Sequence, residues 1–151
     1  MSQFRIKCLH CKHQKTKYVQ LIIGFVYLQV KTDNCLMKIL KDLIDEAHQL
    51  VPKITYNEFN ELSSESLVID VREPTEVDGT QLIPGAINVP RGLIEMKLAP
   101  GSENLTANTS IVVYCGGGSR AALAGKTLKE LGFNFVQNLE GGFRSWKENS
   151  G

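Results

Sequence analysis

The chain has 151 residues, of which 42% are hydrophobic and 22% charged, and its formal net charge is +1 at pH 7. This length suits one domain with a tail, and the balanced charge gives no support to a nucleic-acid partner or an acidic surface. Its four cysteines, at positions 8, 11, 35 and 115, are too few and too uneven for a disulfide framework. We therefore expect a protein of the reducing cytoplasm.

Residues 1–36 differ in character from the rest of the chain. A C-x-x-C pair, Cys8 and Cys11, has His10 and His13 beside it, but Cys35 is the only later cysteine nearby. A closed zinc site usually needs two spaced ligand pairs. The pattern therefore favours an unstructured basic segment over a metal site.

The most apolar stretch of the chain is residues 18–30. Its thirteen residues include two glutamines, so it is too short and too polar for a membrane span of about 20 residues, and no A-x-A-like cleavage site follows. An extra strand and an exposed, aggregation-prone segment both remain open. The pattern changes abruptly at Met37, which favours that residue as the natural start. We expect the domain to span 37–151 and residues 1–36 to be an extension of unspecified structure, outside the natural domain.

From residue 37 onward, helical and strand patterns alternate. Helical spacing predicts a helix over residues 40–50, ended by Pro52, and a capping box at Thr55–Glu58 begins a short second helix. Residues 67–71 read as a buried strand, followed by a helix that Pro74 opens. Residues 83–90 form a turn leading into a short strand.

The last third of the chain continues the alternation. Residues 133–136 predict a strand and residues 138–142 a loop, while Phe143 and Trp146 are expected to anchor a final helix in the core. Such alternation predicts an α/β fold with a mostly parallel sheet covered by helices on both faces. Ligands in such folds bind outside the carboxyl ends of the strands.

The stretch Ile111–Leu131 carries the strongest chemical signal. It reads as a buried strand, then Cys115, three glycines, Ser119 and Arg120, and then a helix with Gly132 just past its end. A thiolate is the reactive form of cysteine, and a helix N-terminus favours an anion. Glycines at 116–118 let backbone N–H groups converge on that anion, and Arg120 adds a positive charge. The pattern favours a nucleophile over an inert buried cysteine.

Four motifs in order resemble the rhodanese family of single-domain sulfurtransferases, over roughly residues 37–148. They are Asp70-Val71-Arg72-Glu73, Ile83-Pro84-Gly85-Ala86-Ile87-Asn88-Val89-Pro90, the loop Cys115 to Arg120, and Asn138-Leu139-Glu140-Gly141-Gly142 with Trp146. The resemblance implies a five-stranded, mainly parallel sheet between helices. It also implies that Cys115 takes the outer sulfur of thiosulfate or a persulfide donor and passes it from a Cys115 persulfide to a thiophilic acceptor, without a cofactor or metal. The acceptor would be cyanide or a cellular thiol, including a thiol on a protein.

The resemblance also implies roles for the residues around the cysteine. Backbone N–H groups of residues 116–120 (Gly116, Gly117, Gly118, Ser119 and Arg120) would cradle the persulfide, and Arg120 would brace the loop. Asp70 and Arg72 would form a supporting ion pair, and Arg91 would face an anionic donor. Two departures stand out. Gln81-Leu82 replace the family's frequent Gly-His, and Gly116 and Gly117 stand where a basic or bulky residue is frequent. The second departure predicts weak binding of thiosulfate, a dianion, and favours a persulfide donor.

Three rival functions can be weighed against sulfur transfer. Phosphatases of related architecture have five residues between their cysteine and arginine, whereas four separate Cys115 from Arg120, so the loop suits a single sulfur better than a phosphate. A Cys–His hydrolase needs a base, and the three histidines, His10, His13 and His48, all lie far upstream. The remaining alternative is a rhodanese-like module that binds a partner without catalysis.

Overall fold

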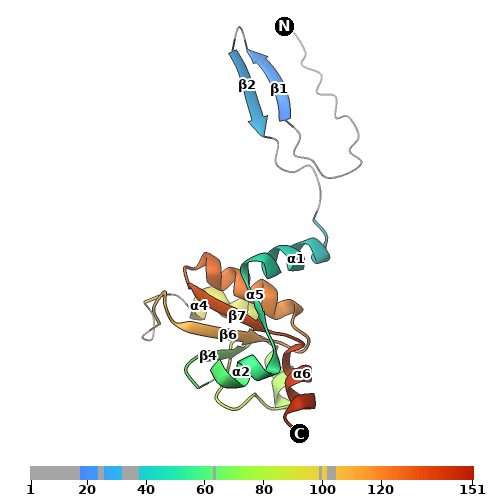
Figure 1. Ribbon diagram of the computed structural model, residues 1–151, viewed down its shortest axis with the longest axis vertical. Coiled ribbons are helices and arrows are strands. Elements are labelled where there is room, and N and C mark those ends of the chain that lie inside the picture. The colour runs from blue at the N-terminus through green and yellow to red at the C-terminus, as the bar shows by residue number, and fades with distance from the viewer. Residues whose placement is uncertain (1–17, 24–25, 32–37, 63, 99, 102–104) are drawn as a thin grey trace. The chain divides into compact units, whose positions relative to one another are not determined.

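The computed structural model describes residues 18–23, 26–31, 38–62, 64–98, 100–101 and 105–151. The chain divides into two units, Met1–Met37 and Lys38–Gly151. In the first, β1 (Tyr18–Ile23) and β2 (Val26–Lys31) pair antiparallel as a sheet of their own (Figure 1). The apolar stretch is thus a strand pair rather than one extra strand. The C-x-x-C segment, with His10 and His13, lies outside the described residues, as does Cys35. Within the described part of the chain, no helix has the length and apolar character of a membrane span.

The second unit is built on a five-stranded sheet in the order β3-β7-β6-β4-β5, and every neighbouring pair in it is parallel. The prediction of a mostly parallel five-stranded sheet is therefore confirmed. The strands are β3 (Lys53–Ile54), β4 (Leu67–Asp70), β5 (Ile87–Asn88), β6 (Ser110–Tyr114) and β7 (Phe135–Leu139).

Helices cover both faces of this sheet (Figure 1). One face carries α1 (Leu40–Leu50), α4 (Ile94–Lys97) and α5 (Ser119–Glu130). A 3₁₀ turn, η1 (Arg91–Leu93), directly precedes α4. The other face carries α2 (Tyr56–Leu62) and α6 (Gly142–Asn149), while α3 (Pro74–Asp78) follows β4. Side chains of a strand alternate between the faces, so Val113 enters one core cluster and Val112 the other.

Local signals in the sequence explain where several elements begin and end. Thr55 and Glu58 form the expected capping box, with the Thr55 N–H donating to Glu58 Oε2 at 2.7 Å. Helix α5 ends at Glu130, and Gly132 lies just past its end as predicted, with a φ of +104° that suits glycine. The Gly132 N–H donates to the Lys129 carbonyl and the Phe133 N–H to that of Leu128, which is the pattern of a Schellman motif.

The boundaries predicted for the last strand were wrong. The strand runs over Phe135–Leu139 instead of 133–136, so Asn138 and Leu139 belong to a strand and not to a loop. Phe133 is occupied in capping α5, and the Asn134 N–H donates to the Ala107 carbonyl. The strand continues to Leu139 because β3 pairs with its last two residues. This register places Asn138 deep in the sheet.

Candidate active site

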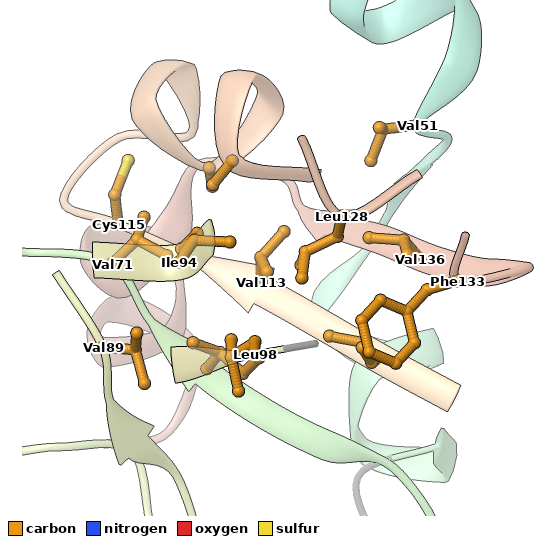
Figure 2. Close-up of a cluster of buried hydrophobic side chains, with 14 residues drawn as sticks. Val51, Val71, Val89, Ile94, Leu98, Val113, Cys115, Leu128, Phe133 and Val136 are labelled. Carbon is orange, nitrogen blue, oxygen red and sulfur yellow. The ribbon is translucent and has the colours of Figure 1, made fainter. Parts of the chain in front are cut away.

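Cys115 directly follows β6 at the carboxyl edge of the sheet. The residue is 2% exposed and forms part of the core cluster on the α5 face. Figure 2 shows it at one end of that cluster, with its sulfur directed away from the other side chains drawn. The Gly118 N–H donates to Cys115 Sγ at 3.1 Å. The thiol therefore lies against the backbone of its own loop.

The loop that follows Cys115 leaves several donors unused. Gly118 is the N-cap of α5 and has a φ of +100°, a left-handed conformation that glycine adopts without strain. Within the described residues, the N–H groups of Gly116, Gly117 and Ser119 have no hydrogen-bond acceptor. Gly117 and Ser119 are exposed and Gly116 is half-buried, so a ligand can reach this part of the loop. A cluster of free N–H groups beside a thiol is therefore suited to hold an anion.

Arg120, in the first turn of α5, binds Glu76 of α3. Its Nη1 and Nη2 donate to Glu76 Oε2 at 2.5 Å and to Oε1 at 2.8 Å. The hydrogen bond from Arg120, together with one from the Glu73 N–H, lowers the pKa of Glu76 to about 2. The hydrogen bond to Glu76 and, to a smaller extent, the proximity of Cys115 raise the pKa of Arg120. The charge that the sequence assigns to the loop is thus paired with a carboxylate on the neighbouring element.

Asp70 and Arg72 form a buried ion pair at the end of β4, with side chains 0% and 3% exposed. Arg72 Nε and Nη2 donate to Asp70 Oδ2 at 2.8 and 2.5 Å, while Nη1 donates to Thr80. Burial opposes the charge on Arg72, but the Asp70 carboxylate raises the pKa of Arg72 overall. The guanidinium also lies 4.2 Å from the ring centroid of Phe143. The pair therefore links β4 to the start of α6.

Arg91 opens η1 at the same edge of the sheet. Its N–H donates to the Val71 carbonyl at 3.3 Å, which places its backbone beside the end of β4. Its side chain is exposed and makes no hydrogen bond or ion pair within the described part of the chain. Within the described residues, no hydrogen bond therefore links this guanidinium to the loop. The hydroxyl of Ser119 is likewise exposed and without a partner there.

Three residues that the sequence reading did not assign to the site contact it. Glu76 of α3 binds Arg120 through both of its carboxylate oxygens. Asn138 donates from Nδ2 to the Gly118 carbonyl at 3.1 Å. Gly142 lies so close to the loop that an added Cβ would be 2.2 Å from the Cys115 carbonyl oxygen. The Gly141-Gly142 pair was the available signal, because adjacent glycines often mark close backbone approach.

Comparison with known proteins identifies the family of this fold. A family model described as the Rhodanese-like domain matches residues 55–149, well over half of the chain. The chain belongs to this family. The matched region includes Cys115, the loop to Arg120, both ion pairs and the start of α6.

Similar proteins include sulfur-handling relatives. YrkF of Bacillus subtilis, provisionally named a sulfur carrier protein, is 34% identical over 99 residues, covering 64% of this chain and 51% of YrkF. The chain thus spans about half the length of that relative. A protein of Allochromatium vinosum named Sulfurtransferase is 31% identical over 98 residues, covering 58% of this chain and 87% of its own length.

A solved structure from Rhodopseudomonas palustris resembles the fold with a TM-score of 0.68 and 30% identity, covering 80% of this chain and 97% of its own. It is described as a protein of unknown function and a possible tyrosine phosphatase.

Proposed function

We propose that this protein is a rhodanese-type sulfurtransferase in which Cys115 carries a sulfane sulfur as a persulfide. One observation carries the proposal. The N–H groups of Gly116, Gly117 and Ser119 have no acceptor within the described residues, and the Gly118 N–H already points at Cys115 Sγ. These donors would stabilise the negative charge of a terminal sulfur.

The proposed reaction has two displacements at sulfur. The Cys115 thiolate attacks the outer sulfur of the donor and forms an S–S bond. The bond between that sulfur and the donor breaks, and the donor leaves with the electron pair, as sulfite from thiosulfate or as a thiolate from a thiol persulfide. An acceptor nucleophile, such as cyanide or a thiol, then attacks the terminal sulfur and releases the Cys115 thiolate. Neither step consumes a base, a cofactor or a metal.

The pairing of Arg120 with Glu76 bears on the choice of donor. Gly116 to Ser119 supply no charged side chain, and the cation that follows them is engaged by a carboxylate at 2.5 and 2.8 Å. A dianion such as thiosulfate therefore meets little uncompensated positive charge at the loop. We propose that a thiol persulfide is the better donor and that thiosulfate is used weakly. Arg91, whose guanidinium has no partner within the described residues, is the proposed contact for an anionic group on the donor.

The names of the relatives support sulfur handling in general. We also propose a cytoplasmic protein whose acceptor is a small thiol or a thiol on another protein, and whose catalytic domain spans residues 37–151. Residues 1–36 are proposed to be dispensable. A truncated chain beginning at Met37 should keep the turnover of the full chain, and a large loss would refute this division.

Steady-state transfer from each donor to cyanide tests the proposal. The full chain should form thiocyanate with ping-pong kinetics, with a higher kcat/KM for a low-molecular-weight thiol persulfide than for thiosulfate. Cys115→Ser is the matched control, because the hydroxyl fits the site but cannot form a persulfide, and it keeps the other three cysteines. Turnover that survives in this variant would contradict the proposal.

The full chain and Cys115→Ser also distinguish sulfur transfer from the rival functions. A phosphatase would release phosphate from an aryl phosphate in a Cys115-dependent manner, which we do not expect from a loop with four residues between Cys115 and Arg120. A non-catalytic binding module would be folded but inactive with every donor and every acceptor.

A further inference from the structure

The direction of the loop's N–H groups is set by donors that lie outside the loop. In a trans peptide the C=O and N–H groups point in opposite directions. A donor that holds the carbonyl of one residue therefore turns the N–H of the next residue the other way. The loop after Cys115 is held in this manner at three of its carbonyls.

The first turn of α6 holds two of these carbonyls. The Phe143 N–H donates to the Cys115 carbonyl at 2.7 Å, and the Arg144 N–H donates to the Gly116 carbonyl at 3.3 Å. These contacts direct the N–H groups of Gly116 and Gly117 away from α6. Gly142 makes the approach feasible, because its φ is +61° and any side chain there would overlap the Cys115 carbonyl.

Asn138 of β7 holds the third carbonyl with its side chain. Its Nδ2 donates to the Gly118 carbonyl at 3.1 Å, and the Ala122 N–H of α5 donates to the same oxygen at 3.0 Å. The peptide between Gly118 and Ser119 is fixed by these two donors. The Ser119 N–H therefore points away from β7.

The rest of the Asn138 side chain indicates why an amide stands here. The residue is 1% exposed, and its Oδ1 accepts no hydrogen bond within the described residues. An idle buried acceptor costs folding free energy, so an apolar side chain of similar size would suit the core at least as well. Among the residues that the structure describes, the bond to the Gly118 carbonyl is the one hydrogen bond that this side-chain amide makes.

We propose that Asn138 is a positioning residue, which acts through the Gly118 carbonyl to aim the Ser119 N–H at the sulfur carried by Cys115. This inference rests on the proposed persulfide chemistry. In this proposal, β7 and α6 fix the directions of N–H groups that all belong to the loop from Cys115 to Arg120. The amide would raise the rate of persulfide formation rather than the affinity for the donor.

Asn138→Asp and Asn138→Leu in the full chain test this role. A carboxylate cannot donate to the Gly118 carbonyl and is repelled by it, whereas a protonated carboxyl can donate. With a thiol persulfide at pH 8, both variants should form the Cys115 persulfide about tenfold to 100-fold more slowly, with little change in KM.

The pH profile supplies a readout that a purely structural role would not move. The rate of Asn138→Asp relative to wild type should rise as the pH falls from 8 towards 5.5, since burial raises the pKa of the introduced carboxyl. Asn138→Leu should show no such recovery. Two residues pair with position 138 across the sheet. They are Val113 on β6, which carries no charge, and Lys53 on β3, whose ammonium lies 3.9 Å from the Glu140 carboxylate. The ratio to wild type removes the pH effects that the two proteins share.

Asn134→Asp is the matched control, because its exposed amide bonds Asn108, away from the loop, and this change should leave the rate unaltered. Rates within twofold of wild type in both Asn138 variants, or a slow Asn138→Asp variant whose ratio does not change with pH, would overturn the inference.

The amide NMR signals of Gly118 and Ser119 give a readout that is independent of activity. Both should move in Asn138→Leu but not in Asn134→Asp, and unmoved signals in Asn138→Leu would also overturn the inference. A wild-type chain that forms no persulfide would instead refute the proposed function.

Discussion

Two neighbouring strands of the same sheet end in arginine–carboxylate pairs that differ in what they leave unsatisfied. After β4, Arg72 is 3% exposed and uses Nε, Nη1 and Nη2 in hydrogen bonds. After β6, Arg120 and Glu76 are 39% and 40% exposed, and three loop N–H groups near them have no acceptor within the described residues. The first end is complete without a ligand, and the second is not. We therefore propose that the β4 pair supports the fold and that the β6 loop receives an anion.

Replacing Arg72, after β4, should have a larger effect on stability than replacing Arg120, after β6. Arg72→Ala leaves the Asp70 carboxylate buried without its partner, which typically costs about 3–5 kcal/mol. We expect the Tm to fall by more than about 10 °C, measured by thermal unfolding followed by circular dichroism. A Tm within a few degrees of wild type would remove the proposed contrast between the two strand ends.

Replacing Arg120 with alanine should affect activity rather than stability. Exposed ion pairs contribute about 0–1 kcal/mol, so Arg120→Ala should lower the Tm by less than about 5 °C. Persulfide formation should slow by about tenfold or more, because the Glu76 carboxylate then stands uncompensated near a negatively charged sulfur. Stopped-flow or quenched mass measurement gives the rate. If Arg120→Ala lowers the Tm strongly but forms the persulfide at the wild-type rate, Arg120 supports the fold and not the reaction, contrary to our assignment.

Glu76→Gln sharpens the comparison by freeing the Arg120 charge while keeping the residue's cap. The Glu73 N–H now donates to Glu76 Oε2 at 3.1 Å, and glutamine can also accept that bond. The KM for thiosulfate should fall about threefold to tenfold, while the KM for a thiol persulfide changes less. High salt should reduce the gain. An unchanged or higher KM for thiosulfate would show that Glu76 does not limit the use of dianions.

A pH series should leave the Arg120–Glu76 pair intact and reveal a smaller effect at His48. Glu76 has a pKa of about 2 and stays charged between pH 5 and 8. Burial, and then the charge of Lys53, lower the pKa of His48 in α1, while Asp45 and Glu140 oppose the shift. The unfolded chain thus takes up a proton on His48 before the folded chain does.

Stability should therefore fall as the pH drops below about 6.5. We expect a decrease in Tm of about 2 °C that His48→Gln diminishes. An equal decrease in both proteins would assign the effect to other groups.

The sequence was sufficient to predict the architecture and the strand, loop and helix around Cys115, since both depend on patterns local in the chain. The alternation of strands and helices, the Thr55–Glu58 cap and the Gly132 helix end all follow from neighbouring residues. The pairing of Arg120 with Glu76 could not be predicted from neighbouring residues, because the two are 44 positions apart and only the fold brings them together. Asn138 was assigned to a loop because the pairing that extends β7, with β3, is also long-range. Its contact with Gly118 depends on that register.

The mass of the intact protein after reaction with a thiol persulfide tests the central claim most directly. We predict the addition of one sulfur atom to the full chain, its removal by cyanide, and the localisation of the sulfur to Cys115 by peptide mapping. Cys115→Ser should gain no cyanide-labile sulfur at the Cys115–Arg120 loop. If the folded wild-type chain gains no sulfur at Cys115 from either a thiol persulfide or thiosulfate, the proposed sulfurtransferase mechanism is contradicted.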